Sequence, residues 1–272
     1  MRHQGREDQL NISEQFEQPE LVTSQNVKHV YRSGETAVTA EPILTEHQID
    51  VYVNERLTMK LVCIPQLLSE LVLGRLLTEG IIRSAAEVEL LYICRHGTRA
   101  KVLLNRDVED TGTPFTETTP SCCTGNHLLN DLFVRSEAPE AIVPIDWKPE
   151  WIFQLADRFR QGMPLHDQTW STHSCFLARD GEILFTCEDI GRHNALDKAI
   201  GYALRHDVDL HRCILYSSGR VPTDMVMKVI RAGVPVFASK SSPTREAVAL
   251  ARQFGLTLIC AAKSDRLTVC TE

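Results

Sequence analysis

The chain has 272 residues, of which 43% are hydrophobic, and its 29 Lys and Arg against 36 Asp and Glu give a formal net charge of -7. Proteins that bind nucleic-acid backbones need an excess of basic residues, so this balance argues against that class. The sequence has no apolar run long enough to span a bilayer and no apolar signal segment at its start, so we expect a cytoplasmic protein without membrane contact.

The first part of the chain predicts an arm followed by a small domain. Residues 1–25 are rich in Gln, Glu and Ser, and we expect them to form a mobile arm. Residues 26–136 predict an α+β domain. Its expected elements are a hairpin over 48–53 and 57–62, a helix that Pro65 opens and Gly80 ends, and a second hairpin over 89–94 and 101–104.

Two adjacent cysteines follow a long polar segment. Residues 105–120 contain almost no apolar side chains, and Ser121, Cys122 and Cys123 come directly after them, before a predicted helix. The positive end of a helix dipole favours a thiolate, so this position indicates a nucleophile. The alternative is a pair of turn cysteines without a chemical role. The other seven cysteines lie in or beside apolar runs and include no C-x-x-C spacing, so we expect packing roles for them in a reducing compartment.

The second half, residues 137–272, alternates strand and helix patterns. A helix near 148–161 precedes a hairpin over 174–178 and 182–187, and a helix over 194–205 follows. The remaining predicted elements are strands and helices in turn: 213–217, 223–231, 234–239, 244–254, 256–261 and 267–271. This pattern predicts an α/β domain with a parallel or mixed sheet and helices on its faces.

Three loops at the ends of these strands combine hydroxyl groups and cations. They contain Ser217, Ser218 and Arg220 in the first, Lys240 and Ser241 in the second, and Ala261, Ala262, Lys263, Ser264, Asp265 and Arg266 in the third. Each alone is consistent with helix capping. Because ligands of open α/β sheets gather at the carboxyl ends of strands, three such loops together predict a site for a ligand with several phosphates.

The segment 188–198, EDIGRHNALDK, concentrates acids, bases and cations at a strand-to-helix turn. Arg192 and His193 are candidates for binding an anion there, with Glu188 or Asp189 orienting them. The alternative is a helix cap with first-turn ion pairs. His173 is a candidate proton donor or acceptor, or a structural residue before a strand.

The 188–198 segment, the Ser217–Arg220 loop and the cysteine-containing loop resemble the FdhD family, the sulfur-carrier accessory proteins of formate dehydrogenase, from about residue 27 to residue 271. The resemblance implies a sulfurtransferase. A loop cysteine takes sulfur from a cysteine desulfurase as a persulfide and passes it to molybdenum-bis(molybdopterin guanine dinucleotide) before that cofactor enters formate dehydrogenase. It also implies a larger domain similar to the cytidine deaminase fold, a three-layer α/β/α sandwich.

The chain departs from the family pattern in the cysteine loop. Family members usually carry C-G-x-C-G, and an ungapped alignment puts Ser121 and Thr124 at those cysteine positions. We therefore expect the persulfide on Cys122, with Cys123 as helper or substitute. The family's cofactor-binding stretch maps onto residues 261–266, where the basic residues match and the middle pair differs. The zinc signature of the deaminases is absent, which argues against a deaminase.

Two other functions remain open from the sequence. One is a cofactor-binding chaperone that moves no sulfur, and the other is a metal-free enzyme that modifies nucleotides. A guanine nucleotide is expected to be a partial mimic of the cofactor. We also expect a homodimer, because twofold dimers are the commonest oligomers.

Overall fold

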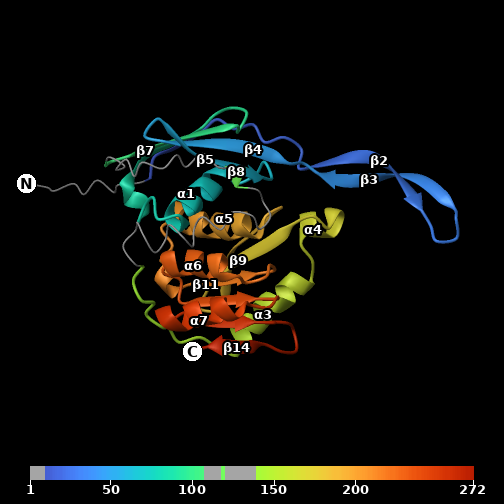
Figure 1. The fold of residues 1–272 in the computed structure, drawn as a ribbon. Helices are drawn as coiled ribbons and strands as arrows, with labels where there is room; N and C mark the ends of the chain where they lie inside the picture. Colours follow the sequence, from blue (N-terminus) through green and yellow to red (C-terminus); the bar gives the residue numbers. More distant parts are fainter. Residues whose placement is uncertain (1–9, 107–117, 120–138) are drawn as a thin grey trace, which may run out of the picture.

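The computed structural model describes residues 10–106, 118–119 and 139–272. It contains two six-stranded sheets and a two-stranded ribbon (Figure 1). The first sheet has the order β1-β6-β7-β4-β5-β8, from strands β1 (Ile12–Glu14), β4 (His47–Val53), β5 (Arg56–Cys63), β6 (Val88–Ile93), β7 (Arg99–Leu104) and β8 (Thr118–Thr119).

The second sheet is mixed and has the order β10-β9-β11-β12-β13-β14. Its strands are β9 (His173–Arg179), β10 (Glu182–Asp189), β11 (Ile214–Ser217), β12 (Val236–Ser239), β13 (Thr257–Cys260) and β14 (Thr268–Thr271). Strands β11, β12 and β13 run parallel, while β9 and β14 pair antiparallel to them. The predicted α/β class with a mixed sheet is confirmed.

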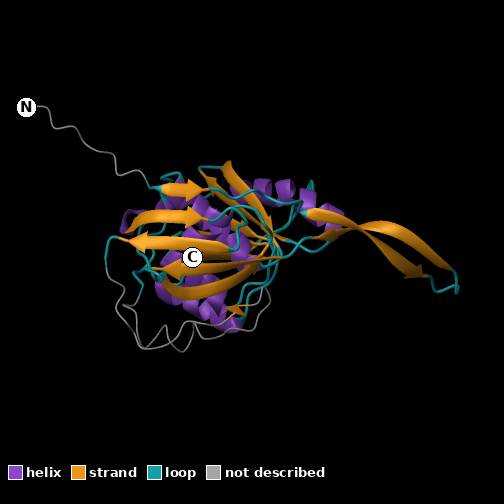
Figure 2. Ribbon diagram, turned by 90° about the horizontal axis from the view of Figure 1, so that it is seen from above, coloured by secondary structure: helices purple, strands orange, loops and turns teal. Residues whose placement is uncertain are grey.

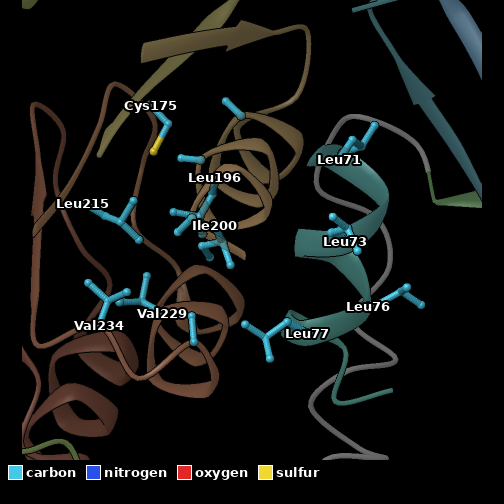
Figure 3. Close-up of a cluster of buried hydrophobic side chains, with 14 of the residues drawn as sticks. Leu71, Leu73, Leu76, Leu77, Cys175, Leu196, Ile200, Leu215, Val229 and Val234 are labelled. Atoms are coloured by element: carbon cyan, nitrogen blue, oxygen red, sulfur yellow. The ribbon is translucent and has the colours of Figure 1, made fainter. Parts of the chain in front are cut away.

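Helices fill the space between the two sheets and cover the far face of the second. They are α1 (Leu68–Thr78), α3 (Pro149–Arg160), α4 (Pro164–Thr169), α5 (Arg192–Arg205), α6 (Thr223–Arg231) and α7 (Arg245–Phe254), with short 3-10 turns at Ala85–Glu87 and Leu210–Arg212. Helix α1 is buried at every residue because it packs on both sides. In Figure 3, Leu77 points toward α6 and Leu76 points the opposite way.

One core cluster runs from the first sheet through α1, α5 and α6 to the second sheet, and a second cluster lies between that sheet and α3. Helices α1 and α5 cross at two glycines. A Cβ atom on Gly74 would lie 1.8 Å from the backbone oxygen of Asp197, and a Cβ on Gly201 would lie 1.8 Å from that of Glu70. Only glycine permits this approach of the two backbones.

The expectation of a mobile arm over residues 1–25 is wrong for part of its described length. Ile12–Glu14 forms β1, which pairs in parallel with β6. Strand β2 (Val22–Val30) begins inside the expected arm and pairs with β3 (Thr36–Leu44) in a ribbon that projects from the body (Figures 1 and 2). The ribbon has exposed apolar side chains at Val30 and Val38.

The other predicted elements agree with the structure within a few residues, except that α1 begins at Leu68, after the turn that contains Pro65. Helix α4 was not expected. The division into domains at residue 137 and the similarity to the cytidine deaminase fold stay predictions. Cys122, Cys123 and the helix expected after them lie outside the described residues.

Candidate functional site

The three hydroxyl-and-cation loops lie at one edge of the second sheet. Ser217 pairs with Ser239 at the ends of β11 and β12, and Ala238 pairs with Ile259 on β13. Backbone hydrogen bonds then join the loops: Lys240 N donates to Ser217 O at 3.0 Å, and Ala262 N donates to Ser239 O at 2.9 Å. The predicted convergence of these loops is confirmed, whereas their role in binding stays a prediction.

The members of this group differ in exposure. Ser217 is buried and accepts the Gly219 N–H at 3.1 Å, so its hydroxyl shapes the turn. The buried Ala262 accepts the Tyr216 hydroxyl at 3.0 Å. Among the others, Ala261, Ser241 and Ser264 are partly buried, and the side chains of Arg220, Lys240, Lys263, Asp265 and Arg266 are exposed. The exposed cations can therefore meet a ligand from solvent.

A cavity of about 310 Å³ opens at the same edge. It is lined by Phe159, His166, Trp170, Ser171, Thr172, His173, Ile190, Ser218 and Lys240. The Lys240 ammonium lies 4.7 Å from the centre of the Phe159 ring, a cation–π contact. The cavity thus combines aromatic surface, imidazole groups and a cation.

His173 and Ser218, two of the predicted site residues, meet inside this cavity. The His173 Nδ1 atom lies 3.3 Å from Ser218 Oγ, which also accepts the Ser174 N–H at 3.0 Å. Burial lowers the pKa of His173, and the positive charges of Arg192, His166 and Arg220 lower it further. A neutral imidazole at neutral pH can accept a proton.

The 188–198 segment is mostly a buried polar network. The Asp189 carboxylate forms an ion pair with Lys198 Nζ at 2.6 Å and accepts a hydrogen bond from Asn194 Nδ2 at 2.8 Å. The carboxylate of Asp197, on α5, forms ion pairs with Lys228 Nζ of α6 at 2.9 Å and with Arg75 Nη1 of α1 at 3.1 Å. Glu188 and Asp189, the expected orienting groups, instead bond to other partners in the described part of the chain: Glu188 to the Leu165 and His166 N–H groups, and Asp189 to Lys198 and Asn194.

His193 points toward α6. Its Nε2 lies 3.2 Å from Asp224 Oδ2, which is ion-pair geometry. Burial, together with the charges of Lys228, Arg192 and Arg75, nevertheless lowers the pKa of His193 to about 3. A lowered pKa favours the neutral imidazole, so this contact is not a strong ion pair at neutral pH.

Arg192 is a buried cation at the start of α5. It is only 7% exposed, and its Nε atom has no hydrogen-bond partner in the structure as described. The aliphatic stem packs against Gly219, where an added Cβ would lie 2.7 Å from Arg192 Cβ. Its neighbour Ile190 lines the cavity. A buried guanidinium nitrogen with no partner among the described residues is unfavourable, so Arg192 is suited to receive an anion.

Sequence reasoning missed Phe159, His166 and Trp170 as cavity residues. His166 and Trp170 lie on and directly after α4, a helix of six residues that is too short for a hydrophobic period to show. Pro164 at its first position was the available signal, because proline favours that position.

Most of the described cysteines have packing roles, as predicted. Burial raises the pKa of Cys63 and Cys187 to about 12 and that of Cys213 to about 11. Burial also raises the pKa of Cys175 and Cys260. These five thiols are protonated at neutral pH and are poor nucleophiles. Cys94 and Cys270 are only partly buried. Within the described ranges, no group of three or more His, Cys, Asp or Glu side chains could hold a metal ion.

Comparison with known proteins assigns the family. The model of the FdhD/NarQ family matches residues 44–272. The chain belongs to the FdhD/NarQ family. Among FdhD/NarQ relatives, a protein named "Sulfur carrier protein FdhD" from Bacillus pumilus is 31% identical over 92% of this chain and 96% of its own length. A protein of the same name from Bacillus subtilis is 30% identical over 89% and 93%.

A solved structure shares the FdhD/NarQ fold. It is described as a putative formate dehydrogenase accessory protein from Desulfotalea psychrophila, and it matches with a TM-score of 0.73 and 25% identity over 93% of this chain and 98% of that one. In the part of this FdhD/NarQ chain that is described, we find no helix with the length and apolar character needed to cross a membrane.

Proposed function

We propose that the chain is a sulfur carrier that serves formate dehydrogenase. A cysteine persulfide forms when the Cys122 or Cys123 thiolate attacks the outer sulfur of a persulfide on a cysteine desulfurase, whose own thiol then leaves. The outer sulfur is next passed to molybdenum-bis(molybdopterin guanine dinucleotide), the substrate, before the cofactor enters formate dehydrogenase. In this step the S–S bond breaks, the cysteine thiolate is released, and the substrate's metal supplies the two electrons that reduce the transferred sulfur to sulfide. The names of the relatives, sulfur carrier protein and formate dehydrogenase accessory protein, support this function.

The observation that carries the substrate class is the buried Arg192, whose Nε has no hydrogen-bond partner among the described residues, near a cavity at the basic edge of the second sheet. A ligand with phosphate groups would supply the missing negative charge. The exposed Arg220, Lys240, Lys263 and Arg266 offer further contacts to such a ligand in a protein that is acidic as a whole. The side chain of His193 contacts Asp224, and its backbone lies in the N-terminal turn of α5.

The assignment of sulfur chemistry to Cys122 and Cys123 draws on the other thiols. Five of the seven described cysteines have raised pKa values because they are buried, so they contain little thiolate at neutral pH. Cys94 is the strongest competitor. Burial opposes ionisation there, but hydrogen bonds from Thr98 and from backbone N–H groups lower its pKa overall.

Alanine variants of these cysteines test the assignment. C122A and C123A, made separately, are expected to reduce activation of formate dehydrogenase, with the larger loss in C122A. C94A is the matched control, because Cys94 is a partly buried thiol outside the cysteine loop, and this variant should activate formate dehydrogenase as the unaltered protein does. Full activation by the C122A/C123A double variant, or loss of activation in C94A, would contradict the assignment.

A further inference from the structure

Helix α4 (Pro164–Thr169) forms one side of the cavity. It carries His166, and Trp170 caps its carboxyl end; both side chains line the cavity. A helix of six residues is not stable alone, so its position depends on contacts with the rest of the molecule. We call His166 and Trp170 the wall of the cavity. Contacts with other residues must hold this wall in place.

Glu188, at the end of β10, supplies three of those contacts. Its carboxylate accepts the Leu165 N–H at 2.9 Å, the His166 N–H at 2.8 Å and the Thr172 hydroxyl at 2.8 Å. The two N–H groups belong to the first turn of α4, where no carbonyl of the helix can accept them. Glu188 is 7% exposed, so water does not compete effectively for these bonds. One buried carboxylate therefore fixes both ends of the segment that carries the wall.

Trp170 has properties that packing does not explain. It is 78% exposed, although indole is a large apolar group that is usually buried. Its backbone lies in the left-handed region, with φ 54° and ψ 18°, where a bulky side chain is rare. The Trp170 and His166 rings meet edge-to-face, with 5.4 Å between the ring centres. The structure thus holds an exposed aromatic ring at the mouth of a cavity in a strained conformation, as ligand clamps do.

Phe159 also lines the cavity, and the Lys240 ammonium lies 4.7 Å from the centre of its ring. A planar heterocycle in this cavity would meet the aromatic surface of Trp170 and Phe159, while Arg192 and the strand-end loops are available to its phosphates. We propose that the wall of His166 and Trp170 binds the planar heterocycle of the substrate, and that Glu188 is the positioning residue of that wall. This inference rests on the proposed function, whose substrate is a guanine dinucleotide cofactor.

Guanosine diphosphate, titrated calorimetrically into the full chain, is the probe. W170A is expected to weaken its affinity about tenfold to a hundredfold, as for loss of one base-stacking ring, and W170F should stay within about threefold of the unaltered protein. E188Q would turn the amide N–H of glutamine toward the N–H groups of Leu165 and His166, which Glu188 accepts. We expect E188Q to weaken the affinity for guanosine diphosphate about tenfold. Because Glu188 acts through the wall, E188Q in the W170A background should cause no further loss.

E70Q is the matched control. Glu70 is as buried as Glu188, at 4% exposure, and accepts Arg205 Nη1 at 2.6 Å, but it lies on α1 and does not line the cavity. E70Q should lower the melting temperature and leave the affinity unchanged, which separates loss of fold stability from loss of the wall.

Three results would overturn the inference: unchanged affinity in W170A, additive losses in the E188Q/W170A pair, or equal losses in E188Q and E70Q. Failure of the unaltered protein to bind guanosine diphosphate would also overturn it. The cysteine variants and their effect on formate dehydrogenase would still test sulfur transfer independently.

Discussion

At the scale of single residues, Arg192 and Arg75 form an informative contrast. Both guanidinium groups are buried, at 7% and 5% exposure. Arg75 has two carboxylate partners, Glu79 at 2.9 Å and Asp197 at 3.1 Å, whereas the Nε of Arg192 has none. A buried charge with partners stabilises the fold relative to its broken pair, while one without partners destabilises it. We interpret the cost at Arg192 as the consequence of a binding role.

The variants R192Q and R75Q are therefore expected to have opposite effects. R192Q keeps the stem carbons that pack on Gly219 and removes an uncompensated charge, so the melting temperature should stay unchanged or rise. Affinity for guanosine diphosphate should fall about tenfold to a hundredfold. R75Q should lower the free energy of unfolding by about 3 kcal/mol and leave affinity intact. Thermal melts and calorimetric titrations check both, and a destabilised R192Q with normal affinity would contradict the role.

His193 predicts a pH dependence of stability. Its pKa is about 3 in the folded chain, because of burial and nearby cations, and about 6.5 when unfolded. Between these values the unfolded state binds more protons, so stability is lost as the pH falls below about 6.5. From pH 7 to pH 5 the unaltered protein should lose about 2 kcal/mol more than H193Q, measured by urea unfolding. Parallel losses in the two proteins would show that His193 does not cause the dependence.

At the scale of elements, the crossing of α1 and α5 is the tightest contact. Alanine normally stabilises a helix relative to glycine by about 1 kcal/mol, so propensity alone predicts more stable G74A and G201A variants. The crossing predicts the reverse, because an added Cβ at either position would lie 1.8 Å from a backbone oxygen. We expect each substitution to lower the free energy of unfolding by about 3 kcal/mol. A rise in the urea midpoint for either variant would contradict the close approach.

Three helices meet at Asp197. Although burial opposes it, Lys228 and Arg75 hold the pKa of Asp197 below its ordinary value. D197N would leave both cations short of a carboxylate, and the expected loss of stability is about 3 to 5 kcal/mol. Asp50, which pairs with Lys60 at 3.9 Å at a partly exposed site, is the control, and D50N should cost less than about 1 kcal/mol. Comparable losses in D197N and D50N, by chemical unfolding, would refute a structural role for this cluster.

The elements differ in how far the sequence predicts them. In the second sheet, buried apolar runs alternate with amphipathic helices, so β11 to α7 follow from periodicity alone. Helix α4 is too short to show a period, and its position depends on Glu188, a residue 22 and 23 positions along the chain from the N–H groups that it accepts. The ribbon of β2 and β3 lacks a buried face that would impose strict alternation, so the sequence alone assigns the start of β2, residues 22–25, to the arm.

At the scale of the whole molecule, the sequence predicted the edge of the site better than its interior. The three basic loops follow strands, and the rule that parallel strands end at one edge brought them together correctly. The wall of His166 and Trp170 could not be predicted, because it depends on tertiary hydrogen bonds to Glu188. For the same reason the EDIGRHNALDK segment indicated a binding site, although Asp189 bonds to Asn194 within the segment, and Asp197 pairs with Arg75 of α1 and Lys228 of α6.

The central claim, that this FdhD/NarQ chain carries sulfur on a loop cysteine, is tested most directly by mass spectrometry. The full chain would be incubated with a cysteine desulfurase and cysteine, and its intact and peptide masses measured without reductant. The account predicts the addition of one sulfur atom on the peptide that contains Cys122 and Cys123, and its loss after treatment with a thiol reductant. No added sulfur on that peptide, or its addition on Cys94 instead, would contradict the account.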